Sequence, residues 1–202
     1  MASLSVGELI VKYIANPPNA ISIFRLIVVL PIAFGITGGE FAISFAIFVV
    51  AAISDGLDGF LARRFGWETA FGKVIDPVAD KLLLLVTTIT LALSGHFPVM
   101  VMLLMVAKDL AVVLGVLVYT ALAGFPELRP IAVGKVTTVL QLVLIGYVLL
   151  TLAVEIPLNH LVTPVLIWIV VVTTILDGCG YLWLWTGKLV RDPRWLAGEA
   201  NA

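Results

Sequence analysis

Long apolar stretches, separated by short polar or glycine- and proline-rich breaks, form the pattern of this chain. Each stretch is close to the roughly 20 apolar residues that a helix needs to cross a bilayer. The pattern predicts six membrane-spanning helices, at residues 19–37, 41–64, 73–94, 98–123, 132–153 and 161–187. Residues 1–15 mix apolar and polar positions in a way that suits a short amphipathic helix at the membrane interface. We therefore expect an all-α integral membrane protein, a six-helix bundle with an N-terminal interfacial helix, forming a single domain over residues 1–202.

The composition excludes an ordinary soluble domain. Of the 202 residues, 61% are hydrophobic and 12% are charged, whereas about a quarter of the residues in a soluble domain are charged. Too few charged side chains are present to cover a water-exposed surface. The net charge of −1 also argues against a nucleic acid as partner, and the one cysteine, Cys179, excludes a disulfide within the chain.

Lysine and arginine residues gather in the breaks on one side of the predicted bundle. The breaks at 37–41, 94–98 and 154–161 contain neither residue. Because positively charged loops stay on the cytoplasmic side of a membrane, the basic loops and both termini are expected in the cytoplasm. The sequence thus predicts a multi-pass protein of the inner (cytoplasmic) membrane.

Four aspartates interrupt the second and third apolar stretches: Asp55, Asp58, Asp76 and Asp80. A carboxylate inside a bilayer costs at least about 2.5 kcal/mol, so such residues are rarely placed there without a function. Asp55 and Asp58 lie about one turn apart on one helix, and Asp76 and Asp80 do so on the next. Since only a short turn joins these helices, the two acidic faces can meet near the cytoplasmic boundary of the membrane.

Four carboxylates form an all-oxygen set of ligands, which suits Mg²⁺ or Mn²⁺ better than zinc. Two such ions would neutralise the aspartates and could bind a pyrophosphate. Gly59, Ala62 and Gly72 leave room for a ligand to approach the backbone, and Arg63 offers a forked donor for phosphate oxygens. Small residues on membrane helices usually serve close packing, but packing does not require four clustered acids. The pattern predicts metal-assisted phosphoryl chemistry at a membrane surface.

These residues resemble the signature of the CDP-alcohol phosphotransferase family. The match covers eight positions and reads Asp55-x2-Asp58-Gly59-x2-Ala62-Arg63-x8-Gly72-x3-Asp76-x3-Asp80. The resemblance implies an enzyme in which an acceptor hydroxyl attacks the phosphatidyl phosphorus of a CDP-linked lipid and CMP leaves. It further implies that the four aspartates hold two Mg²⁺ or Mn²⁺ ions, that Asp80 is also the general base, and that the two glycines, Ala62 and Arg63 contact the cytidine nucleotide. Family members commonly form homodimers, and we expect one here.

Charged residues outside this motif bear on the acceptor alcohol. Lys108 and Asp109 lie near the middle of the fourth predicted span. They either neutralise each other between helices, or Lys108 joins Arg129 and Lys135 in an anion-binding pocket for a phosphate on the acceptor. Neutral acceptors such as serine or choline would not need such a pocket, so an anionic acceptor is favoured. Asp177 is either a polar cap or a partner for one of these cations.

Two further segments, residues 127–130 and 134–141, resemble both phosphatidylglycerophosphate synthases and cardiolipin synthases of the CDP-alcohol type. Lys108 departs from the arginine usual in both groups, whereas Asp109 and Arg129 with the proline after it look more like the cardiolipin type. The resemblance slightly favours phosphatidylglycerol as the acceptor for CDP-diacylglycerol, giving cardiolipin and CMP, over glycerol 3-phosphate. A cation transporter is a remote alternative, because transport sites generally lie at the midplane on broken helices of repeated units, and no repeat is visible here.

Overall fold

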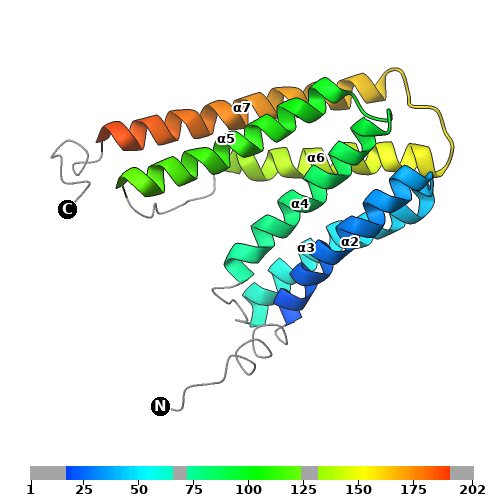
Figure 1. Cartoon of the computed structure of the whole chain (residues 1–202), viewed down its shortest axis with the longest axis horizontal. Coiled ribbons are helices and arrows are strands. Elements are labelled where there is room, and N and C mark those ends of the chain that lie inside the picture. The colour runs from blue at the N-terminus through cyan, green and yellow to red at the C-terminus, as the bar shows by residue number, and fades with distance from the viewer. Residues whose placement is uncertain (1–16, 66–71, 124–131, 192–202) are drawn as a thin grey trace, which may run out of the picture. The chain divides into compact units, whose positions relative to one another are not determined.

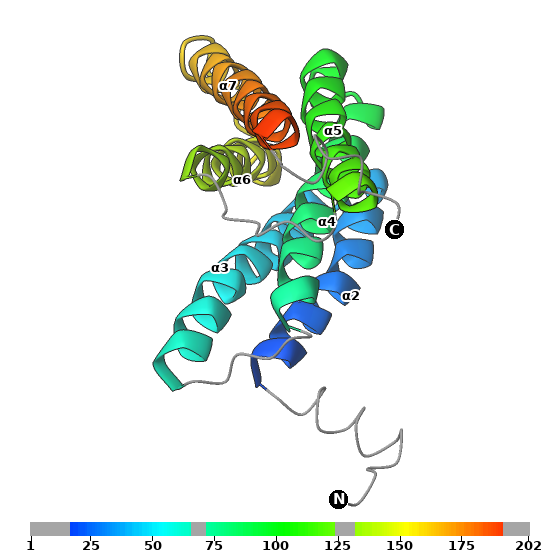
Figure 2. The same ribbon diagram turned by 90° about the vertical axis from the view of Figure 1, so that its left-hand side faces the viewer.

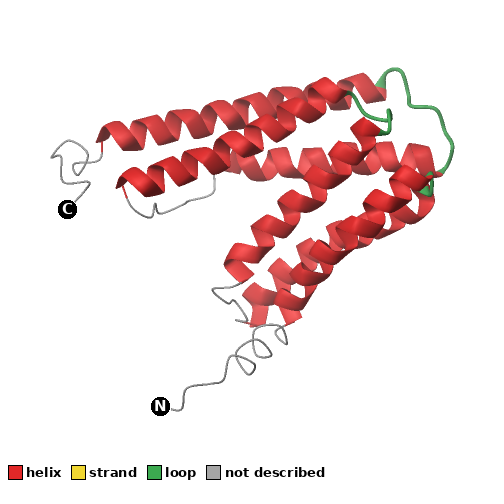
Figure 3. Ribbon diagram, in the orientation of Figure 1, coloured by secondary structure: helices red, strands yellow, loops and turns green. Residues whose placement is uncertain are grey.

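Helices make up all the regular structure in the computed structural model of the chain, over the residues that it describes: 17–65, 72–123 and 132–191. Side chains are described except at 17–18, 55–65, 72–74, 77, 116–123, 132–133, 185–186 and 188–191, where only the backbone is. The helices are α2 (Pro17–Gly38), α3 (Phe41–Phe65), α4 (Gly72–Leu93), α5 (Val99–Ala123), α6 (Ala132–Ala153) and α7 (Val162–Arg191) (Figures 1 and 3).

These helices begin and end within a few residues of the predicted spans, because helices stop at the polar breaks of the sequence. Within the described residues, three are long and apolar enough to cross a membrane: Asn19–Gly38, Gly134–Ala153 and Val162–Leu184. The apolar part of α3, Phe41–Ser54, is shorter. An all-helical chain with membrane-spanning helices is thus confirmed. The count of six spans stays a prediction, as does the interfacial helix at 1–15, which lies outside the described residues.

The chain divides into two compact units, and each is described by itself. The first comprises the residues up to Phe97 together with Ile145–Leu158, and the second comprises Pro98–Leu144 together with the residues from Asn159 onward. In the first unit α2 packs against both α3 and α4 (Figure 2). In the second unit α5 packs along α7. Helix α6 contributes its first part to the second unit and its last part to the first.

Small residues bring α2 and α3 together in the first unit. A Cβ atom on Gly35 of α2 would overlap the hydroxyl of Ser44 on α3, so the two backbones approach closely at this point. Ser44 is completely buried, and its hydroxyl lies 3.1 Å from the carbonyl oxygen of Glu40 and 3.2 Å from that of Ile32. Close approach at small residues is a common way for helices to associate in a membrane, where no hydrophobic effect drives them together.

Three helices of the first unit end in the same way, with the residue after the last turn in the left-handed backbone conformation. That residue is Gly39 after α2, Gly95 after α4 and Glu155 after α6, with φ angles of 79°, 79° and 55°. In each case the N–H groups of this residue and the next donate to carbonyl groups of the last turn, as in a Schellman cap. Glycine adopts this conformation freely, whereas Glu155 adopts it at an energetic cost.

Apolar side chains cover the outer surface of the helices, and polar ones are buried between them. On α2, Ile27, Leu30 and Phe34 are exposed, whereas Arg25 is completely buried. A soluble protein usually places such side chains the other way round. The distribution fits helices surrounded by lipid, in which ionisable residues face the interior of the bundle.

Candidate active site

The buried face of α2 is polar in its first turns and apolar beyond them. Asn19, Ser22 and Arg25 follow one another at intervals of three residues on this face, and each is at most 1% exposed. Farther along, the same face continues with Val29 and Ile32. A buried arginine has to find an anion inside the unit, because an unpaired buried charge is too costly.

The buried face of α4 supplies the anions. Asp76 and Asp80 fall on the same side of α4 as the buried residues Leu83 and Thr87, since these positions recur every three or four residues. Helix α4 packs against α2. The carboxylates of α4 and the polar residues of α2 therefore face each other.

Two polar contacts join α2 to the aspartates of α4. The hydroxyl of Ser22 donates a hydrogen bond to Oδ1 of Asp76, and Nη1 of Arg25 forms an ion pair with Oδ1 of Asp80. The side chain of Arg25 is 0% exposed and that of Asp80 is 31% exposed. Both aspartates are thus held from the side of α2, and the side chain of Asp80 remains partly exposed.

The other six residues of the aspartate motif lie in α3 and at the start of α4. The last turns of α3 contain Asp55, Asp58, Gly59, Ala62 and Arg63, and Gly72 is the first residue of α4. The side chains of these six residues lie outside the described part of the chain, so the convergence of all four aspartates stays a prediction. Among the side chains that are described, no three potential metal ligands come together.

The donor chemistry of α4 fits a divalent cation such as Mg²⁺ or Mn²⁺. Carboxylate oxygens are the ligands that such hard ions prefer. An ionised carboxylate has about four acceptor positions, and the contacts to Ser22 and Arg25 each use Oδ1 alone. Asp76 and Asp80 can therefore stay anchored to α2 and still bind a metal ion.

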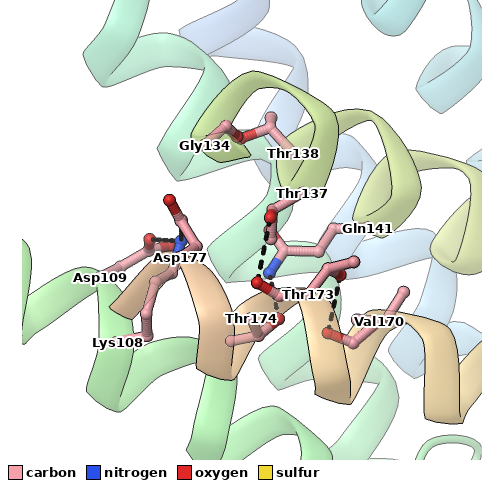
Figure 4. Close-up of polar contacts among 10 residues, drawn as sticks. All are labelled: Lys108, Asp109, Gly134, Thr137, Thr138, Gln141, Val170, Thr173, Thr174 and Asp177. Carbon is pink, nitrogen blue, oxygen red and sulfur yellow. Dashed lines mark hydrogen bonds and ion pairs between the residues drawn. The ribbon is translucent and has the colours of Figure 1, made fainter. Parts of the chain in front are cut away.

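A second buried cluster of charges lies in the second unit, among α5, α6 and α7 (Figure 4). Lys108 of α5 is 7% exposed. Its Nζ atom lies 2.7 Å from Oδ1 of Asp109 and 3.2 Å from Oδ2 of Asp177 on α7. One cation thus faces two carboxylates. Of the two alternatives that the sequence left open for Asp177, the structure shows the partner of a cation.

The two carboxylate oxygens of Asp177 have different surroundings. The residue is 2% exposed; Oδ2 contacts Lys108, whereas Oδ1 has no hydrogen-bond donor among the described residues. Figure 4 shows one oxygen of Asp177 directed away from Lys108, toward α6. There, a Cβ atom on Gly134 would lie 3.1 Å from Oδ1 of Asp177 and 3.4 Å from the hydroxyl oxygen of Tyr181. The absence of a side chain at Gly134 thus allows both polar groups to approach the backbone of α6.

Hydrogen bonds between α6 and α7 continue along the helices from this point. The hydroxyl of Thr137 donates to the carbonyl oxygen of Thr173 at 3.3 Å, and Nε2 of Gln141 donates to the hydroxyl of Thr174 at 3.2 Å. Thr137, Gln141 and Thr174 are each at most 1% exposed. These contacts fix α6 against α7 beside Asp177 (Figure 4).

The three residues predicted to bind an acceptor phosphate have different environments. Lys108 is buried between carboxylates, Lys135 is exposed in the first turn of α6, and Arg129 lies outside the described residues. Lys108 also lines a largely apolar cavity of about 310 Å³ between α5 and α7, with Leu104 and Leu182 among the other lining residues. The anion-binding role of this set stays a prediction.

Ser22 and Arg25 lie outside the aspartate motif, although the sequence contains a signal for Arg25. Arg25 is the only charged residue between Pro17 and Gly38. An isolated charge in a span marks a residue that faces the interior and has a partner there. That partner, Asp80, is 55 positions away in the chain, so no local sequence pattern identifies it.

The chain is similar to known proteins over most of its length. Residues 15–176 match the sequence model of the family described as CDP-alcohol phosphatidyltransferase. A probable phosphatidylglycerophosphate synthase of Mycobacterium tuberculosis is 32% identical over 89% of this chain and 84% of its own length. A CDP-diacylglycerol--glycerol-3-phosphate 3-phosphatidyltransferase of Rickettsia felis is 32% identical over 82% of this chain and 93% of its own length. Cardiolipin synthase (CMP-forming) of Homo sapiens is 27% identical over 64% of this chain and 48% of its own length.

The matched residues include all eight positions of the aspartate motif and most of the described helices. The family expected from the sequence is therefore confirmed, and with it the reaction class and a role in phospholipid biosynthesis. The chain belongs to the CDP-alcohol phosphatidyltransferase family and is a membrane enzyme of that class.

Proposed function

We propose that this enzyme transfers the phosphatidyl group of CDP-diacylglycerol to a hydroxyl of an anionic, glycerol-based acceptor, with release of CMP. The observation that carries the proposal is the arrangement of Asp76 and Asp80, the last two aspartates of the family motif. They lie one turn apart on α4, and α2 holds both. Asp80 is oriented by Arg25 and remains partly exposed, as expected of a base that meets a substrate.

In the proposed reaction, Asp80 accepts the proton of the acceptor hydroxyl while the hydroxyl oxygen attacks the phosphatidyl phosphorus. The bond from that phosphorus to the bridging oxygen of the pyrophosphate breaks, and CMP leaves with the electron pair. Arg25 keeps the carboxylate of Asp80 in one orientation, which lowers the entropy lost when the reacting groups align. Four motif residues are proposed to contact the cytidine nucleotide: Gly59, Ala62, Arg63 and Gly72.

Asp55, Asp58, Asp76 and Asp80 are proposed to hold two ions of Mg²⁺ or Mn²⁺. The family is generally dependent on divalent metals. Bound by these carboxylates, the ions would stabilise negative charge on the phosphate oxygens. Chelation with EDTA is expected to abolish CMP release, and an excess of Mg²⁺ or Mn²⁺ is expected to restore it. Activity that persists in EDTA would contradict the metal assignment.

Two acceptors have support of their own. Glycerol 3-phosphate is favoured by the relatives from Mycobacterium tuberculosis and Rickettsia felis, which match most of this chain and whose names specify that product or acceptor. Phosphatidylglycerol is favoured by Asp109 and Arg129, which resemble the cardiolipin type, and by similarity to the human cardiolipin synthase. Both acceptors combine a glycerol with a phosphate, so the same pocket chemistry serves either one.

Arg129 and Lys135 are proposed to bind the acceptor phosphate. Lys135 is exposed, so its ammonium group is available to an anion. Lys108 is the third residue of the predicted pocket, but Asp109 and Asp177 already match its charge. Its contribution to anion binding is therefore expected to be the smallest of the three.

The proposed setting is the inner membrane, with both termini and the active site on the cytoplasmic side, and a homodimer formed by the single domain. The absence of lysine and arginine from 37–41, 94–98 and 154–161 supports this orientation. In a Cys179→Ala background, His96→Cys and Asn159→Cys should react with an impermeant maleimide added outside intact cells. Chemical crosslinking in membranes tests the dimer.

The purified protein in detergent tests the reaction directly. CDP-diacylglycerol and Mg²⁺ are incubated with phosphatidylglycerol, with glycerol 3-phosphate, or with serine and inositol phosphate as controls. CMP release is measured, and the lipid product is identified by mass spectrometry. Release with phosphatidylglycerol or glycerol 3-phosphate alone supports the proposal and names the acceptor. Release only with serine or inositol phosphate would reject both acceptors.

A further inference from the structure

A completely buried serine of α2 contacts the aspartate motif from a neighbouring helix. Ser22 is 0% exposed, and its hydroxyl donates a hydrogen bond to Oδ1 of Asp76 on α4, 54 positions away in the chain. The hydroxyl groups of Ser54, Thr90 and Thr173, by comparison, donate to carbonyl groups of their own helices. The contact of Ser22 differs from these because it restrains the side chain of a motif residue.

The two residues of this hydrogen bond differ in exposure. Ser22 is buried, whereas Asp76 is partly exposed. The bond involves Oδ1 of Asp76, and an ionised carboxylate has about four acceptor positions, so the same carboxylate can also bind a cation. In metal sites of proteins, ligating carboxylates are commonly held in this way by residues that do not touch the ion.

The contact from Arg25 to Asp80 is of a different electrostatic kind. Arg25 forms an ion pair with Asp80, and its guanidinium group brings a positive charge that repels a nearby metal ion. The hydroxyl of Ser22 is neutral, so it orients Asp76 without bringing a positive charge to the site. Of the two contacts from α2, the one from Ser22 is therefore the better suited to support a metal ligand.

We infer that Ser22 is a positioning residue for metal binding: its hydrogen bond holds Asp76 in the orientation in which the carboxylate binds the divalent cation. This inference rests on the proposed function, in which Asp76 is one of the metal ligands. Ser22 acts through Asp76 and does not contact the ion or a substrate. Loss of its hydroxyl should weaken metal binding about tenfold to a hundredfold, as is typical of residues that support a metal ligand.

Titration of the purified protein in detergent with Mn²⁺ alone tests the inference. Free Mn²⁺ is measured by its electron paramagnetic resonance signal, without CDP-diacylglycerol or acceptor, so binding is measured separately from activity. Ser22→Ala is expected to raise the dissociation constant about tenfold to a hundredfold. Ser22→Thr, which keeps the hydroxyl, should retain most of the affinity. Ser22→Cys, whose thiol is a weak donor of similar size, should weaken binding as alanine does and serves if the alanine variant does not fold.

Ser44 on α3 provides the matched control. It is also a completely buried serine of the first unit, but its hydroxyl contacts the backbone carbonyl groups of Ile32 and Glu40. Ser44→Ala removes the same atom from the same type of residue and should leave the dissociation constant for Mn²⁺ unchanged. Equal weakening in Ser22→Ala and Ser44→Ala would show that lost packing, and not the orientation of Asp76, lowers the affinity.

Thermal unfolding separates metal binding from the stability of the fold. Mn²⁺ that binds the folded protein raises Tm, and the concentration at which Tm rises depends on the dissociation constant. In Ser22→Ala this concentration, and the one that supports CMP release, should both increase about tenfold to a hundredfold. In Arg25→Met the loss should be mainly in kcat, because Arg25 contacts Asp80. A shift in Mn²⁺ dependence as large as that of Ser22→Ala would contradict the specific role of Ser22.

The outcomes distinguish this inference from the proposed function. If the wild-type protein binds no Mn²⁺, the metal assignment of the proposed function fails. If the wild-type protein binds Mn²⁺ and Ser22→Ala binds it with the same dissociation constant, the proposed function stands and the role of Ser22 is wrong.

Discussion

Each of the two units contains a buried ion pair, but the more deeply buried member is the cation in one unit and the carboxylate in the other. In the first unit the buried partner is the cation, Arg25 at 0% exposure, and its carboxylate Asp80 is 31% exposed. In the second unit the most deeply buried partner is a carboxylate, Asp177, and the charge of Lys108 is shared with Asp109. The side chain of Asp80 is therefore held in place and still partly exposed, whereas the side chain of Asp177 is held in place and almost completely buried.

This difference separates a carboxylate that a substrate can reach from a carboxylate that is buried in an ion pair between α5 and α7. A general base has to contact the substrate and therefore stays partly exposed. The cation that pairs with it does not contact the substrate and can be completely buried. The helix contacts also differ between the units. In the first unit α2 approaches α3 closely at Gly35, whereas in the second unit hydrogen bonds of Thr137 and Gln141 join α6 to α7.

The largest expected effect is the loss of the reactive carboxylate. Asp80→Asn should lower the rate of CMP release by about a thousandfold or more, since the amide cannot accept the proton and general base catalysis contributes about 10²–10⁴-fold. The purified variant is assayed with saturating CDP-diacylglycerol and acceptor. An elution profile in size-exclusion chromatography like that of the wild type serves as the folding control. Undiminished turnover would remove Asp80 from the mechanism.

Removal of the cation from the second unit should be the most destabilising change. Lys108→Met leaves Asp177 buried without its partner, and breaking a buried ion pair in this way costs about 3–5 kcal/mol. Thermal unfolding in detergent measures the loss. The double variant Lys108→Met with Asp177→Leu should recover much of the stability, because the buried carboxylate is also gone. If the single variant is as stable as the wild type, the cluster is not a buried ion pair.

The equivalent change in the first unit should cost less. Arg25→Met leaves Asp80, whose side chain is 31% exposed, so that its carboxylate can be hydrated once the arginine is gone. The free energy of unfolding should therefore fall by about 1–3 kcal/mol, less than for Lys108→Met, while activity falls because Asp80 is no longer oriented. Arg25→Lys should recover part of the activity by restoring the charge. An effect on stability larger than that of Lys108→Met would reverse the comparison between the units.

The smallest effect concerns the packing of α2 on α3. Gly35→Ala introduces an overlap with the buried Ser44 and should lower the free energy of unfolding by about 1–2 kcal/mol. Gly38→Ala, near the end of the same helix, is the matched control, because nothing lies within 4 Å of its added Cβ. The same unfolding assay compares the two variants. Equal stability of both would show that close approach at Gly35 does not hold these helices together.

Helix boundaries could be predicted well because they depend on local signals. The breaks at Gly39 and Gly95 carry residues that adopt the left-handed conformation without strain, and the helices end there. At Glu155 no glycine is present, and the break is indicated by Glu155 itself and by Pro157, Asn159 and His160 after it. The aspartate motif could likewise be found from spacing alone, since its members lie on two consecutive helices.

The partners of the charged residues could not be predicted in this way. Ser22 and Asp76 are separated by 54 positions, and Lys108 and Asp177 by 69. The sequence restricts each of them to a helix and a face, but many pairings of faces are compatible with the same periodicity. For Asp177 both a cap and an ion pair fit the local pattern, and packing selected the ion pair.

By itself, the sequence determined that this chain is a helical membrane protein, where its helices lie, and which family motif it carries. These properties follow from the length of apolar stretches and from helical periodicity, which involve only neighbouring residues. The tertiary structure alone decided that Arg25 orients Asp80, that Asp177 meets Lys108, and that Gly134 admits Asp177 to the backbone of α6. The physical reason is that a buried charge or acceptor must be satisfied by whichever group packing brings to it, and that group is distant in the chain.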